Sequence, residues 1–432
     1  MTDRAFGIES LCLHAGQLPD PVTGSRAQPI YQTTSYIFDS ADHAASLFNL
    51  QTFGNVYSRI SNPTVAVFEE RVAALENGRA ALATASGMAA QLTAMLAILQ
   101  PGDHIVASSL LYGGTYSQFA VTLPKMGITT TFVDPDDPEN FRRALQPNTR
   151  LVYGETLGNP KINVLDIERV AAIAHEAGIP LMIDNTMASP YLCRPLDWGA
   201  DIVVHSATKY MGGHGTTLGG VVVESGKFDW GNGKFPGMTE PSAGYHGVKF
   251  YETFGDFGFT MKARMETLRT FGPALSPFAA WQLMQGIETL HLRMQRHCEN
   301  ALAVARHLEQ HARVAWVNYP GLPASPAYAL AQRYLGSVRH PGAGALLAFG
   351  VKGGQAAGER FIDALQFCSH LANIGDAKTL VIHPASTTHR QLGEADQRAS
   401  GVTPDMVRLS VGIETLEDIL WDIDQALERS AS

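Results

Sequence analysis

The feature that most constrains the fold is an alternation of short apolar segments and helical segments between residues 80 and 224. The apolar segments are ALATA, HIVASS, ITTTFVD, TRLVYGET, IPLMIDNT, DIVVHSATK and GGVVVES, and helical patterns separate most of them. Short, continuously apolar strands that alternate with helices are typical of a mostly parallel sheet covered on both faces. We therefore predict an α/β fold for this part of the chain.

The rest of the chain divides into three further kinds of sequence. Residues 1–60 are rich in Pro, Thr, Tyr, Gly and Asn and show little helical period, which predicts an extended arm. The stretch 225–260 is rich in Gly and aromatic residues, and we expect an ordered functional loop there. Helical patterns then dominate, with a few strand-like segments. We predict an arm over 1–60, a large domain over 61–265 and a smaller C-terminal α+β domain over 266–432.

Composition argues against several classes of protein. The chain has 432 residues and a formal net charge of -9, so it has no bulk attraction for nucleic acid or for an anionic membrane surface. Its N-terminal segment lacks the apolar core of a signal peptide, and no stretch approaches the ~18 consecutive apolar residues of a membrane helix. The four cysteines are scattered without metal-ligand spacing (Cys12, Cys193, Cys298 and Cys368). We therefore expect no metal, no nucleic-acid or membrane partner, and a cytoplasmic protein with reduced thiols.

A lysine and two hydroxyl residues follow one of the predicted strands. Ser206, Thr208 and Lys209 come directly after the apolar run DIVVH. A lysine at the carboxyl end of a strand can face the edge of the sheet where α/β proteins bind ligands, and hydroxyls beside it can hold phosphate oxygens. Taken alone, the segment fits a solvent-exposed lysine in a glycine-rich turn better than it fits a site.

Two other strand ends carry polar groups. Asp184 ends an apolar strand, where a carboxylate is costly unless it is paired, so it could bind a cation or simply cap the following turn. Ser86 and Gly87 stand between a strand and a helix, where free amides form an anion site, although most such turns bind nothing. Together with Lys209 they offer a phosphate cradle, a carboxylate and an amine on one sheet. Pyridoxal 5'-phosphate (PLP) requires this combination, and we predict a PLP enzyme.

Six short motifs, taken together, resemble those of a known family. In chain order they are YSRISNPT, SGMAA, DNT, HSATKYMGGH, HPASTTH and RLSVGIE. They resemble the Cys/Met-metabolism family of PLP-dependent enzymes, and the likeness extends from Tyr31 to Ala426. The resemblance implies PLP fold type I, with a mostly parallel seven-stranded sheet in a large domain and a smaller C-terminal α+β domain.

The resemblance also implies the residues that hold the cofactor. Lys209 would carry PLP as a Schiff base and move protons, Asp184 would pair with the pyridinium nitrogen, and Tyr112 would stack on the ring and take part in catalysis. Two turns would hold the phosphate, through Ser86, Gly87, Met88, Ser206 and Thr208.

Substrate-binding residues and a partner subunit follow from the same resemblance. Tyr57 and Arg59 would reach the phosphate of a neighbouring subunit's cofactor, with Tyr57 also near the substrate, which implies dimers paired into a homotetramer. Asn159 would bind the phenolic oxygen of the cofactor or the substrate carboxylate. Arg408 would clamp that carboxylate, with Asn373 at the same wall. Without the resemblance, Arg59 and Arg408 read as ordinary surface charges.

Two features indicate the branch of the family. The segments KFPGMTEPSAGYHGVKFYETFG and LANIGDAKTLVIHPASTTH resemble the O-acetylhomoserine sulfhydrylase branch, and Asn373 stands where lyases and synthases usually have a serine. The methionine γ-lyase branch has a cysteine after LYG, where this chain has Gly113 and Gly114. We expect γ-replacement on O-acetyl-L-homoserine with sulfide, giving homocysteine and acetate for methionine biosynthesis. The alternatives are a cystathionine γ-synthase, an O-succinylhomoserine sulfhydrylase or a methionine γ-lyase.

Other ionisable residues near these motifs receive plainer interpretations. We expect His205, His214 and His383 to be structural or to support the site from behind. Glu155 either braces the site or is a simple carboxylate at the end of a strand, and the sequence leaves both open. A non-catalytic scaffold that kept the fold would need none of Lys209, Asp184 and Arg408, so the presence of all three argues against that class.

Overall fold

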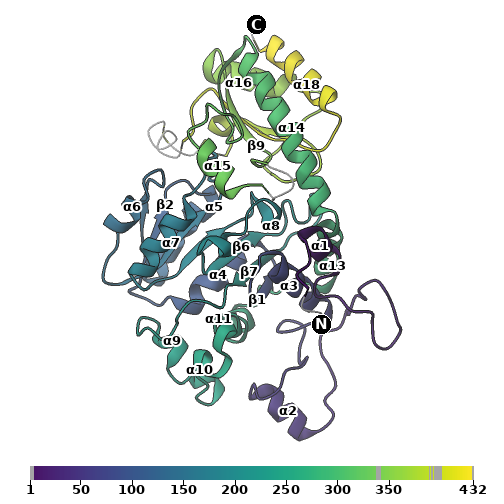
Figure 1. Cartoon of the computed structure of the whole chain (residues 1–432), viewed down its shortest axis with the longest axis vertical. Coiled ribbons are helices and arrows are strands. Elements are labelled where there is room, and N and C mark those ends of the chain that lie inside the picture. The colour runs from purple at the N-terminus through teal and green to yellow at the C-terminus, as the bar shows by residue number, and fades with distance from the viewer. Residues whose placement is uncertain (1–3, 337–341, 389, 391–392, 394–400, 431–432) are drawn as a thin grey trace.

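Two sheets organise the computed structural model, which describes residues 4–336, 342–388, 390, 393 and 401–430. The seven strands of the larger sheet are β1 (Ala80–Thr84), β2 (His104–Ser108), β3 (Thr129–Val133), β4 (Thr149–Glu155), β5 (Leu181–Asp184), β6 (Ile202–Ser206) and β7 (Gly220–Glu224). The five strands of the smaller sheet are β8 (Val314–Asn318), β9 (Leu346–Val351), β10 (Ser369–His370), β11 (Leu380–Ile382) and β12 (Met406–Ser410). In Figure 1 the smaller sheet lies above the larger one.

The larger sheet confirms the predicted α/β class and its mostly parallel character. Its strand order is β1-β7-β6-β5-β4-β2-β3, and β2 to β6 pair in parallel. Only β7 runs antiparallel to both of its neighbours. The register places Glu155 on β4 beside Asp184 on β5, and Asp184 beside Val204 on β6. The carboxyl ends of these three strands therefore meet at one edge of the sheet.

Helices cover this sheet and begin where the sequence provides capping residues. They are α3 (Pro63–Leu75), α4 (Gly87–Ile98), α5 (Gly113–Ser117), α6 (Glu139–Arg143), α7 (Ile167–Glu176) and α8 (Ser189–Leu192). The side chain of Asn62 accepts a hydrogen bond from Thr64 N at 2.9 Å, with Pro63 in the first turn, and these features start α3. Helix α4 has apolar residues around most of its circumference because it packs against both β6 and β7.

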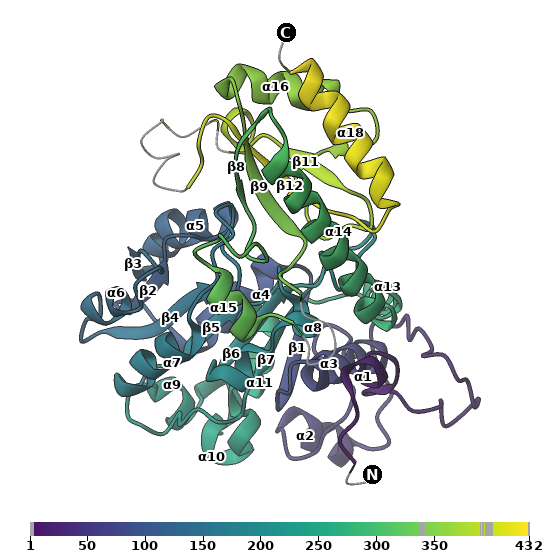
Figure 2. The ribbon, with the colours of Figure 1, turned by 45° about the horizontal axis from the view of Figure 1, so that its top comes forward.

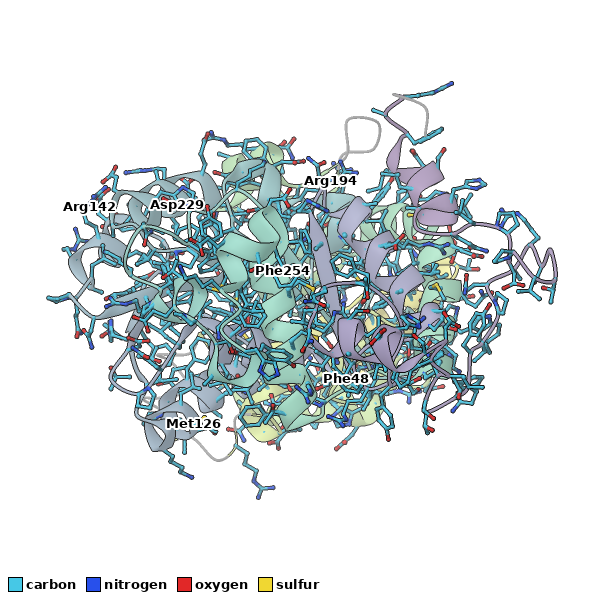
Figure 3. The ribbon with its side chains drawn as sticks, turned by 90° about the horizontal axis from the view of Figure 1, so that it is seen from below. Phe48, Met126, Arg142, Arg194, Asp229 and Phe254 are labelled. Atoms are coloured by element: carbon cyan, nitrogen blue, oxygen red, sulfur yellow. The ribbon has the colours of Figure 1, made fainter. Side chains whose placement is uncertain are left out.

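The arm over residues 1–60 is less irregular than its sequence predicts. It contains α1 (Ile8–His14) and α2 (Ala41–Phe48), and Ser40 starts α2 by accepting a hydrogen bond from His43 N at 3.0 Å. Two turns of helix in a polar segment are too short to give a recognisable period, which explains the wrong prediction. In Figure 3, seen from below, the purple arm extends along one side of the molecule, with Phe48 visible on α2.

The segment 225–260 is ordered, as predicted. It contains α9 (Pro236–Thr239) and α10 (Phe250–Phe254) and ends within α11 (Gly258–Lys262), and α12 (Arg269–Phe271) follows it. Trp230 stacks on Phe259 with 5.4 Å between ring centroids, which ties the segment to α11.

The C-terminal part is built on the five-stranded sheet, in the order β10-β11-β12-β9-β8. Its helices are α13 (Pro277–Glu288), α14 (Leu290–Gln310), α15 (Tyr328–Tyr334), α16 (Gly354–Ala364) and α18 (Leu416–Arg429). Figure 2 shows β9 and β12 near the centre of this sheet, with α14, α16 and α18 around it. Two strand-like segments of the sequence, ALLAFGVKGG and MVRLSVGIE, form β9 and β12, whereas the sequence did not indicate β8. Among the described residues, no helix has the length and apolar character to cross a bilayer.

Candidate active site

A cavity of about 190 Å³ lies where the carboxyl ends of β4, β5 and β6 face the smaller sheet. Its lining contains all but two of the residues proposed from the sequence: Ser86, Gly87, Met88, Tyr112, Asn159, Asp184, Ser206, Thr208, Lys209, Asn373 and Arg408. The larger sheet and its loops provide most of the lining, and β12 and the loop before β11 provide the rest. Segments more than 300 residues apart in the sequence therefore form one cavity.

The Lys209 amine lies inside this cavity. It donates a hydrogen bond to Asn373 Oδ1, across the boundary between the two sheets. Burial lowers the pKa of Lys209, and the positive charge of Arg408 lowers it further. A lowered pKa favours the neutral amine, the form that attacks a carbonyl carbon or accepts a proton.

Asp184 provides a carboxylate at the end of β5. Its Oδ1 accepts a hydrogen bond from Thr186 N at 2.9 Å. Burial raises the pKa of Asp184, while the hydrogen bonds from Thr186 and the nearby His205 oppose that rise. Among the described residues, no lysine or arginine forms an ion pair with this carboxylate. A protonated ring nitrogen is therefore a suitable partner for Asp184.

Glu155 ends the neighbouring strand and braces the helix that carries Tyr112. Its Oε1 accepts a hydrogen bond from Tyr112 N at 2.7 Å, at the start of α5. Burial raises the pKa of Glu155 well above its ordinary value, and the Asp184 carboxylate raises it further. Tyr112 is held by its backbone, while 52% of the residue stays exposed at the cavity. Of the two interpretations of Glu155, the structure favours the brace.

The amino end of α4 and the β6 turn form a cradle for an anion. Ser86 Oγ accepts a hydrogen bond from Ala89 N at 3.2 Å and caps the helix. A Cβ atom on Gly87 would lie 2.6 Å from the Cβ of Ser206, so glycine is required for this approach. Thr208 Oγ1 accepts a hydrogen bond from Gly219 N at 3.0 Å. A helix amino end with hydroxyls beside it fits a phosphate group.

Arg408 enters the cavity from the smaller sheet. It lies on β12 between Ala348 of β9 and Ile382 of β11. Its Nη1 donates to Asn159 Oδ1 at 3.0 Å, and its Nη2 donates to the carbonyl oxygen of Asn373 at 3.4 Å. Burial lowers the pKa of Arg408 to about 10, so the guanidinium stays charged at neutral pH.

Tyr57 and Arg59 are the two proposed residues that do not line the cavity of their own chain. The guanidinium carbon of Arg59 lies 5.4 Å from the centre of the Tyr57 ring, and Arg59 also donates to the carbonyl oxygen of Arg269. The segment 225–260 likewise contributes no residue to this lining, so a role for it in the chain's own site is not supported.

Sequence reasoning missed a set of buried polar residues behind the cavity. His205 and Asn185 both hydrogen-bond to one oxygen of Glu76, and Asn185 also accepts from Thr156. His205 was expected to support the site from behind, and its position beside Ser206 agrees. For Asn185 and Thr156, the available signal was a sequence neighbour that lines the cavity: Asp184 in the DNT motif, and Glu155. Nothing in the sequence pairs them with Glu76.

Two further expectations concern metals and the HPASTTH motif. Among the described residues, no group of three His, Cys, Asp or Glu side chains is arranged to hold a metal ion. His383 hydrogen-bonds to Ser386 Oγ at 2.8 Å and to the carbonyl oxygen of Pro404 at 2.9 Å, which is a structural role. The last residue of that motif, at 389, lies outside the described residues.

Comparison with known proteins adds the family. The model of the family described as "Cys/Met metabolism PLP-dependent enzyme" matches residues 9–428. The O-acetyl-L-homoserine sulfhydrylase of Leptospira meyeri is 56% identical, over 98% of this chain and 97% of that protein. The homocysteine synthase of Schizosaccharomyces pombe is 54% identical, over 98% of each chain.

A solved structure agrees with the fold. The crystal structure of a putative O-acetylhomoserine (thiol)-lyase from Campylobacter jejuni has a TM-score of 0.94 and 38% sequence identity, and covers 98% of this chain and 100% of that one. That protein contains a lysine modified as N'-pyridoxyl-lysine-5'-monophosphate. The family match and the fold agree with the lysine, carboxylate and anion cradle of the cavity. The chain therefore belongs to the Cys/Met metabolism family of PLP-dependent enzymes.

Proposed function

We propose that this chain catalyses γ-replacement on O-acetyl-L-homoserine with sulfide, giving L-homocysteine and acetate. The observation that carries the proposal is the charge of the cavity: its described lining contains only two cationic side chains, Lys209 and Arg408. Lys209 is needed for the cofactor and Arg408 for the α-carboxylate of the substrate. A succinyl ester, or cysteine as the nucleophile, would bring a further carboxylate into the cavity. The described lining has no third cationic side chain to bind it.

The residues of the cavity fit PLP. We assign the amine of Lys209 to the cofactor aldehyde, the carboxylate of Asp184 to the ring nitrogen, and Tyr112 to the face of the ring. Ser86, Gly87, Met88, Ser206 and Thr208 surround the phosphate position. Bound PLP supplies an electron sink that makes the carbon–hydrogen bonds of the substrate's α- and β-carbons acidic. The neutral Lys209 amine, favoured by burial, accepts and returns those protons.

The remaining lining positions the substrate. Arg408 offers a planar pair of donors to the α-carboxylate, and its contacts with Asn159 and Asn373 fix its orientation. Asn159 is also positioned to bind the phenolic oxygen of the cofactor. Apolar side chains form much of the other wall: Leu157, Met187, Leu218, Ala372 and Ile374. Such a wall suits the uncharged acetyl ester and keeps water away from the reacting carbons.

The N-terminal arm supports an assembly in which subunits share sites. Ile37 is 96% exposed and Phe53 is 75% exposed, and large apolar side chains in such positions mark protein contact surfaces. We assign the arm, residues 1–60, to a second copy of the chain, where Tyr57 and Arg59 approach the partner's phosphate. Two such dimers form a homotetramer. Coexpression of Arg59→Ala and Lys209→Ala variants tests this, because mixed dimers regain one intact site and part of the activity.

The domain boundaries and the compartment are part of the same proposal. We assign residues 61–265 to the cofactor-binding large domain and 266–432 to the small domain, since the two sheets fall within these ranges. We place the protein in the cytoplasm, because its four cysteines are free, buried thiols, as in a reducing compartment.

A substrate panel tests the reaction. The purified holoenzyme is given O-acetylhomoserine with sulfide, O-succinylhomoserine with cysteine, or methionine alone, and homocysteine, cystathionine and methanethiol are measured. We expect rapid homocysteine formation in the first mixture and little turnover in the others. Formation of cystathionine faster than that of homocysteine, or rapid release of methanethiol from methionine, would show that the enzyme catalyses a different reaction.

A further inference from the structure

One carboxylate is buried directly behind the cofactor site. Glu76 follows the last turn of α3, and its side chain has no exposed surface. This position is costly for a carboxylate, because it is removed from water and lies at the negative end of a helix dipole. A buried charge in such a position requires close partners, so its contacts indicate what it holds in place.

The contacts of Glu76 converge on the strand ends that carry cavity residues. Its Oε1 atom lies 2.6 Å from His205 Nε2 and 2.8 Å from Asn185 Nδ2. His205 immediately precedes Ser206, and Asn185 immediately follows Asp184. A single oxygen atom thus connects the phosphate side of the site with the ring-nitrogen side.

A second layer of hydrogen bonds extends the network to β4. Asn185 Oδ1 accepts a hydrogen bond from Thr156 Oγ1 at 2.8 Å, and Thr156 follows Glu155. Nearer the cavity, Ser206 N donates to Thr186 Oγ1 at 2.7 Å, and Thr186 N donates to Asp184. The ends of three neighbouring strands are therefore linked by side chains as well as by the sheet.

We propose that Glu76 is a positioning residue for the cofactor, acting through His205 and Asn185 on Ser206 and Asp184. This inference rests on the proposed cofactor roles of Asp184 and Ser206. Glu76 fixes the His205 ring and the Asn185 amide, and thereby the strand ends that carry Ser206 and Asp184 toward the cofactor's phosphate and ring nitrogen. His205 also counteracts the rise in the Asp184 pKa that burial causes.

Helix α3 offers a matched control. Glu69 is also buried; its Oε1 accepts from Ala83 N at 2.7 Å and its Oε2 accepts from Arg264 Nη2 at 2.7 Å. None of its partners is adjacent in sequence to a cavity residue. Loss of Glu69 should therefore destabilise the fold without reaching the cofactor site.

The test compares Glu76→Gln, His205→Gln and Glu69→Gln in the full chain. Three properties are measured: the dissociation constant of PLP from the stripped protein, the pH midpoint of the visible band of the holoprotein, and Tm. We expect Glu76→Gln and His205→Gln each to weaken PLP binding by about tenfold or more, as for loss of a charge-assisted hydrogen bond, and to shift the midpoint. The double variant should bind PLP about as weakly as Glu76→Gln alone, because the contact between Glu76 and His205 is already broken in that single variant.

The control decides between positioning and general stability. We expect Glu69→Gln to lower Tm while leaving the PLP dissociation constant within about twofold of the wild type. Wild-type PLP affinity and midpoint in both Glu76→Gln and His205→Gln would overturn the inference, as would equal shifts in Glu69→Gln. If Glu76→Gln does not fold, His205→Gln decides alone. None of these readouts uses substrate, so they are independent of the proposed reaction.

Discussion

Replacement of Arg408 by lysine tests how the cavity recognises a carboxylate. The guanidinium keeps two contacts with the protein, at 3.0 Å to Asn159 and at 3.4 Å to Asn373, and its other donors are left for the substrate. Lysine retains the charge but cannot offer two parallel donors. Loss of one charge-assisted hydrogen bond costs about 1.5–3 kcal/mol, which is roughly a 10- to 150-fold rise in KM. Since the carboxylate does not react, kcat should change far less.

The same variant should acquire a pH dependence. Burial lowers the pKa of Arg408 to about 10, so the native side chain is charged throughout the working range. A lysine begins from an ordinary pKa of about 10.4, and burial next to Lys209 would lower it from there. Lysine is charged only below its pKa, so the ratio of the variant's KM to the wild-type KM should rise from pH 7 to pH 9.

Steady-state kinetics with O-acetylhomoserine at saturating sulfide measure both effects. PLP content, read from the visible band, is the control, because Arg408 is assigned to the substrate and not to the cofactor. A variant with wild-type KM at both pH values would refute the assigned role. A fall in kcat at constant KM would place Arg408 in the transition state instead.

Three further changes test other parts of the account. Gly87→Ala places a Cβ atom 2.6 Å from the Cβ of Ser206, so we expect weaker PLP binding in a spectrophotometric titration. Unchanged binding would contradict the assignment of this turn to the phosphate. Burial and Asp184 raise the pKa of Glu155 and so favour its neutral form. The isosteric Glu155→Gln variant, whose side-chain oxygen can still accept from Tyr112 N, should keep kcat within about threefold, and a hundredfold loss, about 3 kcal/mol, would mean a charged role. Burial lowers the pKa of His297 from 6.5 to about 4 in the folded protein. Between these two pH values His297 is protonated in the unfolded chain but not in the folded one, so the free energy of unfolding should fall by about 3 kcal/mol as the pH drops from 6.5 to 4. His297→Gln should flatten that dependence in urea unfolding, and an equal slope would contradict it.

The sequence predicted those parts of the site that lie at the ends of strands. Ser86, Asp184 and Lys209 each stand at or just after the end of a recognisable apolar segment. The strands β5 and β6 pair in parallel, and β1 runs in the same direction because β7 is antiparallel to both β1 and β6, so these ends lie at one edge of the sheet. Their meeting in one cavity is confirmed. The expectation rested on local pattern, which is where sequence reasoning is strongest.

Contacts between distant segments could not be predicted in this way. His205 and Glu76 are 129 residues apart, and neither position shows in its sequence neighbourhood that it has a partner. Arg408 reaches the cavity only because a second sheet packs above the first, so its assignment depended on resemblance to a family. The helices of the arm were missed because each is shorter than the period-based signal requires.

The most direct test of the central claim is to locate the cofactor on the chain. The purified holoprotein is treated with borohydride, which makes the link between lysine and cofactor permanent, and is then digested for peptide mass spectrometry. We expect a single pyridoxyl-phosphate modification, on the peptide that contains Lys209, and none in a Lys209→Ala variant. Modification of another lysine, or an unmodified Lys209 in a protein that retains its visible band, would contradict the account.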